Sequence, residues 1–187
     1  MSLTPSIMLP LGTKAPLFTL HDTVSDTSVE LSHLQSEIAT VIFFICNHCP
    51  YVRHIQTELV AAAKKYQAKN IQFIAINSND ISAYPEDSPE KMQEQALQFD
   101  YPFPYLFDPT QAVAKSYQAA CTPDFYIFDK NLACVYRGRF DDSTPGNNKP
   151  VTGQDLCAAL DAILADKPVN AAQMPSVGCN IKWKKTN

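Results

Sequence analysis

The sequence predicts an α/β fold in which a central mixed sheet is flanked by helices. Residues 39–46 form an apolar run of β-branched and aromatic residues, the pattern of a strand buried on both faces, and residues 71–77 repeat it. Residues 50–68, between these runs, place apolar side chains at helical spacing. A strand, a helix and a second strand in this order require a crossover, so the two strands are predicted to pair in parallel.

The remaining elements are predicted from turn and capping patterns. Residues 15–31 alternate on both sides of a polar D-T-V-S-D-T turn, which indicates an N-terminal β-hairpin. Ser88 and Pro89 have the pattern of an N-cap followed by proline in the first turn, so a helix is expected to about Phe99. Further along the chain we expect a short strand at 105–107, a helix at 110–118, strands at 124–129 and 134–140 joined by Lys130-Asn131, and a last helix at 152–166.

The chain is predicted to hold one domain and a tail. Residues 1–168 contain all the predicted helices and strands, and 187 residues are enough to bury a core without metal ions or disulfides. Residues 169–187 show no periodic pattern, so we expect an irregular C-terminal tail that packs on the domain. The antiparallel strands 124–129 and 134–140 are expected at one edge of the sheet.

Composition excludes several classes of partner. Hydrophobic residues make up 45% of the chain and charged residues 18%, the balance of a folded globular protein. The formal net charge of −4 offers no electrostatic attraction for nucleic acid. No apolar run approaches the roughly 18 residues of a membrane span. Pro5 and Pro10 interrupt an N-terminus that lacks basic residues, so we expect a cytoplasmic protein, or a periplasmic one if a signal has been removed.

Two cysteines stand at the junction between the first buried strand and the following helix. Cys46 is predicted at the end of the strand and Cys49 at the start of the helix, in the motif C-N-H-C-P. The positive end of the helix dipole stabilises a thiolate, so we expect a lowered pKa for Cys46, which makes it the candidate nucleophile. Cys49, one turn further on, could resolve the mixed disulfide. A metal site and a pair of inert cysteines are the two alternatives.

Residues between and beyond this pair are further candidates. Asn47 and His48 separate the two cysteines, and a histidine that carries positive charge favours the reduced thiolate and makes a dithiol more oxidising. Cys121 and Cys179 are candidate additional redox thiols, and Cys179 belongs to the tail. The other two cysteines, Cys134 in a predicted strand and Cys157 in a predicted helix, are expected to be buried structural residues.

Three motifs in order resemble the redoxin branch of the thioredoxin fold. They are G-T-K-A-P-L-F-T-L-H-D at 12–22, C-N-H-C-P-Y-V at 46–52 and C-T-P-D-F-Y-I-F-D at 121–129. This branch includes the alkyl hydroperoxide reductase and thiol-specific antioxidant proteins and the TlpA/ResA-like thiol-disulfide oxidoreductases. The resemblance covers about residues 10–165 and implies a thioredoxin-like fold in which the helix at 88–100 is an insertion.

The resemblance also implies the substrate site. The Thr122-Pro123 peptide bond is expected to be cis and to pack against the cysteines, with the backbone of Thr122 pairing with an extended substrate. Plain thioredoxins have a tryptophan and a buried carboxylate where this chain has Ile45 and Thr40. The residue that exchanges protons with the resolving cysteine is therefore not identified by the resemblance.

The expected activity is thiol-disulfide oxidoreduction by Cys46 and Cys49, without an organic cofactor. Substrates would be protein disulfides, small thiols or peroxides, and a separate reductant would restore the dithiol. The alternative is a peroxiredoxin-like peroxidase. The chain lacks the P-x-x-x-T-x-x-C pattern of those enzymes, but Arg53 or Arg137 could still approach the cysteine. A metal-binding chaperone of the same fold is a third hypothesis.

Overall fold

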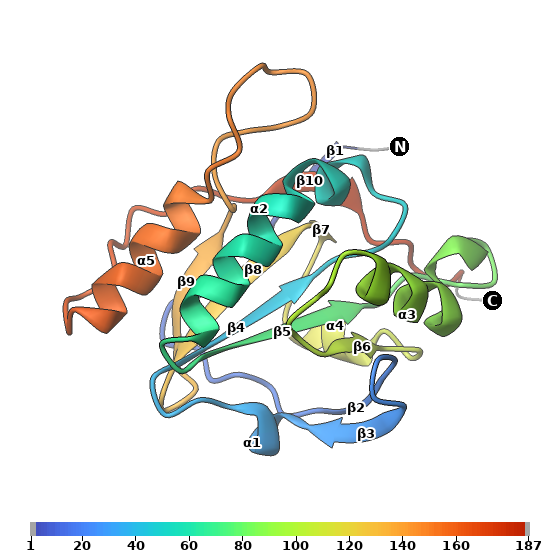
Figure 1. Cartoon of the computed structure of the whole chain (residues 1–187), viewed down its shortest axis with the longest axis horizontal. Helices are drawn as coiled ribbons and strands as arrows, with labels where there is room; N and C mark the ends of the chain where they lie inside the picture. The colour runs from blue at the N-terminus through green and yellow to red at the C-terminus, as the bar shows by residue number, and fades with distance from the viewer. Residues whose placement is uncertain (1–2, 186–187) are drawn as a thin grey trace.

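The computed structural model of the chain describes residues 3–185 and contains the predicted central mixed sheet (Figure 1). The strands of this sheet are β2 (Thr19–Asp22), β3 (Thr27–Glu30), β4 (Ala39–Phe44), β5 (Ile71–Asn77), β6 (Tyr105–Phe107), β8 (Asp124–Asp129) and β9 (Cys134–Gly138). They lie in the order β3-β2-β6-β5-β4-β8-β9. All six residues of β4, near the centre, are buried, as the unbroken apolar run predicts.

The pairing of the strands confirms the parallel centre and the antiparallel edge. Strands β4 and β5 are parallel, as are β5 and β6. Strand β8 runs antiparallel to β4, and β9 runs antiparallel to β8. The N-terminal hairpin formed by β2 and β3 joins the opposite edge, where β2 pairs antiparallel with β6. The hairpin thus extends the central sheet.

Helices cover both faces of the sheet. They are α1 (Leu31–Leu34), α2 (Pro50–Gln67), the short 3-10 turn η1 (Pro85–Asp87), α3 (Pro89–Gln98), α4 (Ala112–Ser116) and α5 (Gln154–Leu164). Residues of α2, α3 and α5 share one buried apolar cluster with β4 and β5. Residues of α1 and α4 join the cluster on the opposite face. In Figure 1 helix α2 lies across the front of the sheet, and its N-terminal end faces β7 and β10.

The cap of α3 follows the sequence prediction and allows a stability test. The Ser88 side chain accepts a hydrogen bond from the Lys91 N–H, and Pro89 occupies the first turn. We expect Ser88→Ala to lower the free energy of unfolding by about 1 kcal/mol, because one N–H of the first turn loses its acceptor. Urea denaturation measures this change. Ser88→Asp keeps an acceptor and is the matched control; equal destabilisation by both substitutions would contradict the capping role.

The loop between β8 and β9 differs from the predicted two-residue turn. The Asp129 N–H donates to the Ala133 carbonyl, so residues 130–132 form a three-residue loop. Leu132 has a φ of 57°, in the left-handed region. The Asp129 carboxylate accepts the N–H groups of Asn131 and Ala133, which holds the loop in this longer form. The side chain of Asp129 therefore decides the loop length.

The prediction of an irregular C-terminal tail was wrong for one segment. Val177–Asn180 forms strand β10, which lies between β1 (Leu3–Pro5) and β7 (Cys121–Thr122) in a separate antiparallel sheet. Its neighbours β1 and β7 are short, and both lie far from β10 in the sequence. No local pattern in the sequence therefore predicts that residues 177–180 form a strand. The tail packs on the domain by completing this sheet. Within residues 3–185, no helix has both the length and the apolar character to cross a membrane.

Candidate active site

The two cysteines of the C-N-H-C-P motif lie where the sheet gives way to a helix. Strand β4 ends at Phe44, and Cys46 follows it by two residues. Cys49 is the N-cap residue of α2, with Pro50 in the first turn. Both side chains are buried, with exposed fractions of 1% and 0%. All six cysteines of the chain are free thiols in this structure.

A second segment meets the cysteines from the junction of β7 and β8. The Thr122-Pro123 peptide bond is cis, as the resemblance implied. The Cys46 Sγ lies 3.6 Å from the Thr122 Oγ1, and the Cys49 thiol donates to the Thr122 carbonyl at 3.1 Å. Thr122 thus contacts both sulfurs, one through its side chain and the other through its backbone.

The pKa values of the two thiols reverse the expectation for Cys46. A hydrogen bond shared with Cys49, burial and the negative charge of Asp87 raise the pKa of Cys46 well above its ordinary value. The same shared hydrogen bond lowers the pKa of Cys49 to about 5, against the effect of burial. Cys49 is the N-cap residue itself and lies nearer to the first N–H groups of α2, whereas Cys46 precedes the helix and faces a carboxylate. The thiolate is therefore stabilised at Cys49.

Asp87 organises the two residues between the cysteines. Its side chain is fully buried and accepts hydrogen bonds from the Asn47 N–H at 2.8 Å and from the Asn79 side chain at 2.8 Å. The same carboxylate lies 2.7 Å from the His48 Nδ1. The Asn47 side-chain oxygen also accepts a hydrogen bond from the Tyr105 hydroxyl. These hydrogen bonds hold the loop between the two cysteines in place.

His48 lies between this carboxylate and an aromatic ring. The hydrogen bond to Asp87 raises the pKa of His48, which favours the imidazolium. The imidazole stacks on Tyr84 with ring centroids 5.2 Å apart and an interplanar angle of 8°. A ring nitrogen of His48, the Cys46 Sγ and an Asp87 oxygen lie within 4.8 Å of one another. A positive charge on His48 is thus close enough to act on the dithiol.

Asp87 and Tyr84 were not identified from the sequence. Both belong to Y-P-E-D-S-P, in which Ser88 and Pro89 predict the start of helix α3. The acidic pair ahead of an N-cap is common, so nothing local marks Asp87 as a partner of a histidine 39 residues earlier. The one relevant observation in the sequence is that Thr40 occupies the position at which plain thioredoxins have a buried carboxylate.

The same three groups are a candidate metal-ligand set. Among residues 3–185, Cys46, His48 and Asp87 are the one cluster of three such side chains close enough to share an ion. A structural zinc site takes four ligands, and the His48 Nδ1 is already hydrogen-bonded to the Asp87 carboxylate. The arrangement fits a hydrogen-bonded Cys-His-Asp group at least as well as a metal centre.

The backbone of Thr122 is not open to a substrate in this structure. Strand β10 pairs with β7, and Cys179 lies opposite Thr122 in the register. The expected pairing of Thr122 with an extended substrate is therefore replaced by pairing with the chain's own tail. Cys179 is buried and hydrogen-bonded to Cys49. In contrast, the Cys121 thiol donates to the Pro123 carbonyl, and no contact places it against Cys46.

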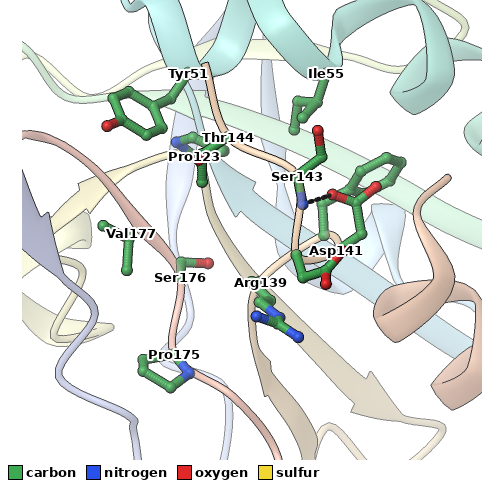
Figure 2. Close-up of a pocket in the computed structure, with 12 residues that line it drawn as sticks. Tyr51, Ile55, Pro123, Arg139, Asp141, Ser143, Thr144, Pro175, Ser176 and Val177 are labelled. Carbon is green, nitrogen blue, oxygen red and sulfur yellow. Dashed lines mark hydrogen bonds between the residues drawn. The ribbon is translucent and has the colours of Figure 1, made fainter. Parts of the chain in front are cut away.

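A small pocket lies beside the cis-proline (Figure 2). Its volume is about 80 Å³, and Pro123 forms part of its wall. Figure 2 shows Tyr51 and Ile55 of α2 above Pro123, with Val177 of the tail beside it. Neither cysteine of the C-N-H-C-P motif lines the pocket.

The remaining candidates lie at different distances from the cysteines. The Arg53 Nε donates to the Asn47 carbonyl at 2.9 Å, so this cation is next to the C-N-H-C loop. Arg137 lies on β9 and bonds to Gln173 in the tail. Cys134 is buried, as predicted, whereas Cys157 on α5 is only partly buried.

A mixed sheet with helices on both faces, and a C-x-x-C pair at the start of a helix against a cis-proline, define a thioredoxin-fold protein of the redoxin class. Residues 11–137 match the AhpC/TSA family, and the chain belongs to this family. No curated protein matches the chain.

Several solved structures share this fold. An uncharacterized conserved protein from Geobacillus kaustophilus is 56% identical over 100% of this chain and 99% of its own, with a TM-score of 0.98. A hypothetical protein from Sinorhizobium meliloti 1021 is 44% identical over 98% and 100%, with a TM-score of 0.95. A secreted disulfide oxidoreductase from Mycobacterium tuberculosis is 16% identical over 78% and 95%, with a TM-score of 0.59, and shares the fold.

Proposed function

We propose that the protein is a thiol-disulfide oxidoreductase that uses Cys46 and Cys49 as a redox-active dithiol. The observation that supports this most directly is the placement of both sulfurs against Thr122, at 3.6 Å and 3.1 Å. The thiols also share a hydrogen bond with each other, so they are close enough to exchange a disulfide. The reaction needs no organic cofactor, since electrons pass through the sulfur atoms.

In the proposed cycle Cys46 attacks the substrate disulfide and Cys49 resolves it. The first step breaks the substrate S–S bond, forms a mixed disulfide at Cys46 and releases one substrate thiol, which takes up the proton that Cys46 loses. Cys49 then attacks the Cys46 sulfur, which forms the Cys46–Cys49 disulfide and releases the second thiol. The hydrogen bond shared with Cys46 is the main cause of the lowered pKa of Cys49, and interactions with Thr122, Cys179 and the Val52 N–H lower it further. A lowered pKa favours the thiolate, the form in which a cysteine attacks a disulfide.

The proposed substrates are small disulfides, with a separate thiol as the reductant that restores the dithiol. Both sulfurs are buried, and β10 occupies the Thr122 backbone that an extended protein substrate would use. A small molecule requires less displacement of the covering segments than a polypeptide does. We place this exchange in the cytoplasm, where a pool of small thiols could serve as the reductant.

Turnover of oxidised glutathione with dithiothreitol as reductant tests this proposal. We expect catalysis by wild type, and formation of a Cys46–Cys49 linkage when the reductant is withheld, mapped by mass spectrometry after thiol alkylation. Cys157→Ser, on helix α5, is the matched control and should react like wild type. Absence of both turnover and the linkage would reject the proposed activity.

A peroxidase is the second candidate, and the position of Arg53 is the observation that favours it. This cation reaches the loop between the cysteines through the Asn47 carbonyl. Peroxidases of the wider class use an arginine near the cysteine, although the chain lacks their threonine pattern. Consumption of hydrogen peroxide by the same variants distinguishes the two candidates. Peroxide turnover that is lost in Arg53→Met while disulfide turnover persists would favour the peroxidase.

We expect His48→Gln to make the dithiol more reducing. The imidazolium stabilises the thiolate, and therefore the reduced form, so its removal shifts the equilibrium toward the disulfide by about tenfold, or about 30 mV. Equilibration with defined glutathione ratios measures this constant. Asp87 raises the pKa of His48. The difference between His48→Gln and wild type should therefore be greatest at low pH, where His48 is charged, and should disappear as the pH rises through the pKa of His48. His54→Gln, further along α2, is the control; an unchanged constant in His48→Gln would contradict this role.

A further inference from the structure

Strand β10 brings a third thiol to the dithiol. It pairs antiparallel with β7, with Cys179 directly opposite Thr122. Directly opposite residues of an antiparallel pair have their side chains on the same face. The Thr122 hydroxyl on that face lies 3.6 Å from the Cys46 Sγ. The register thus directs Cys179 toward the two cysteines of the proposed active site.

The contacts of Cys179 agree with this register. Its side chain is 3% exposed and belongs to the same buried cluster as Cys46 and Cys49. The Cys179 thiol is hydrogen-bonded to Cys49, which in turn is hydrogen-bonded to Cys46. Three sulfurs therefore follow one another in a continuous chain of contacts, with Cys49 in the middle.

The close approach of β10 depends on a glycine. A Cβ built on Gly178 would lie 2.0 Å from the Thr122 carbonyl oxygen and 2.8 Å from its carbon. Any side chain at this position would push β10 away from β7. Gly178 precedes Cys179 directly, so its missing side chain is what lets the third thiol reach the site.

Anchors on both sides of β10 hold the strand in place. Before it, the Ser176 hydroxyl donates to the Gly138 carbonyl at 2.6 Å. After it, the Lys182 N–H donates to the Asn79 side chain at 2.8 Å, and the Asp80 N–H donates to the Lys182 carbonyl at 2.8 Å. Asn79 also binds Asp87, so the tail is connected to the group that positions His48.

We propose that Cys179 is a third redox thiol, which exchanges with the Cys46–Cys49 disulfide to form a Cys49–Cys179 disulfide. This inference rests on the proposed function, which supplies the first disulfide. The Cys179 sulfur attacks the Cys49 sulfur, the Cys46–Cys49 bond breaks as the Cys49–Cys179 bond forms, and the electron pair goes to Cys46. Cys46 takes up the proton that Cys179 loses, so the exchange needs no further oxidant or reductant.

The exchange has two consequences for the molecule. Cys46 becomes a thiol again while the chain still holds one disulfide. Strand β10 becomes covalently fixed over the Thr122 backbone, so the oxidised protein keeps this edge covered. In the reduced protein, burial and the charge of Cys49 raise the pKa of Cys179 to about 12. Cys49 carries no charge once it is in a disulfide, which removes one of these obstacles.

Disulfide mapping of the full-length chain tests the exchange. Wild type is oxidised with oxidised glutathione, free thiols are blocked with N-ethylmaleimide, and linkages are identified by mass spectrometry. We expect molecules in which Cys46 is alkylated and Cys49 is linked to Cys179. In Cys46→Ser this linkage should be the main product at these positions. Its absence from both proteins, or a Cys49–Cys121 linkage in its place, would overturn the proposal.

Two further variants separate the inference from the proposed function. Gly178→Ala should lower the yield of the Cys49–Cys179 linkage at least tenfold, while the Cys46–Cys49 linkage still forms. An unchanged yield would overturn the proposal that close packing of β10 on Thr122 brings Cys179 to Cys49. Cys179→Ser tests the dithiol alone. A Cys46–Cys49 linkage and turnover of oxidised glutathione in this variant support the proposed function whether or not Cys179 exchanges. Circular dichroism verifies the fold of each variant.

Discussion

Cys46→Ser and Cys49→Ser should each reduce the turnover of a small disulfide by a factor on the order of a thousand or more, because neither residual thiol can complete the cycle alone. The two variants should fail at different steps. Cys49→Ser can still form the mixed disulfide at Cys46, so it should accumulate this adduct with a substrate thiol. Cys46→Ser has no attacking sulfur at that position. Steady-state rates and intact-mass measurement of the adduct read out both steps.

The same variants test separately which of the two cysteines attacks the substrate disulfide first. The structure stabilises the thiolate at Cys49, and an adduct found in Cys46→Ser but not in Cys49→Ser would show that Cys49 attacks first. The peroxide assay adds a second decision. Peroxide turnover that survives Cys49→Ser and is lost in Cys46→Ser would identify a peroxidase. Cys134→Ser, buried in β9, is the control and should retain disulfide turnover.

Asp124→Asn should stabilise the protein above pH 7. Asp124 is fully buried, its Oδ2 accepts the Tyr126 hydroxyl, and its Oδ1 has no partner among residues 3–185. Burial raises its pKa from 3.8 to about 7. The folded state therefore binds the proton more tightly than the unfolded chain, and wild type loses stability as the pH rises from about 4 to about 7. A shift of this size corresponds to about 4 kcal/mol.

Urea denaturation across this pH range measures the effect. Asp124→Asn removes the ionisation while keeping the shape, so the two free energies of unfolding should agree near pH 4 and differ most above pH 7. Asp166→Asn replaces an exposed carboxylate and should leave the pH dependence of wild type unchanged. Equal stability of wild type and Asp124→Asn at pH 8 would mean that the buried carboxylate finds a partner when it ionises.

The local parts of the site were predictable because they depend on neighbouring residues. An apolar run that ends at Cys46, and a helix that begins after Cys49, place the pair at a strand-to-helix junction. The C-T-P motif added the proline loop through the family resemblance. The raised pKa of Cys46 was not predictable in this way, because it comes from a hydrogen bond shared with Cys49, from burial and from the charge of Asp87, a residue of η1.

The sequence by itself determined the parallel centre of the sheet, the helix that follows the dithiol and the cap at Ser88, since hydrophobic periodicity and capping act over a few residues. Only the tertiary structure brought Asp87 to His48 and seated Gly178 and Cys179 on Thr122. These contacts join segments tens of residues apart, and they form because the folded core brings those segments together. The acid next to the histidine and the third thiol next to the dithiol are therefore properties of the packing.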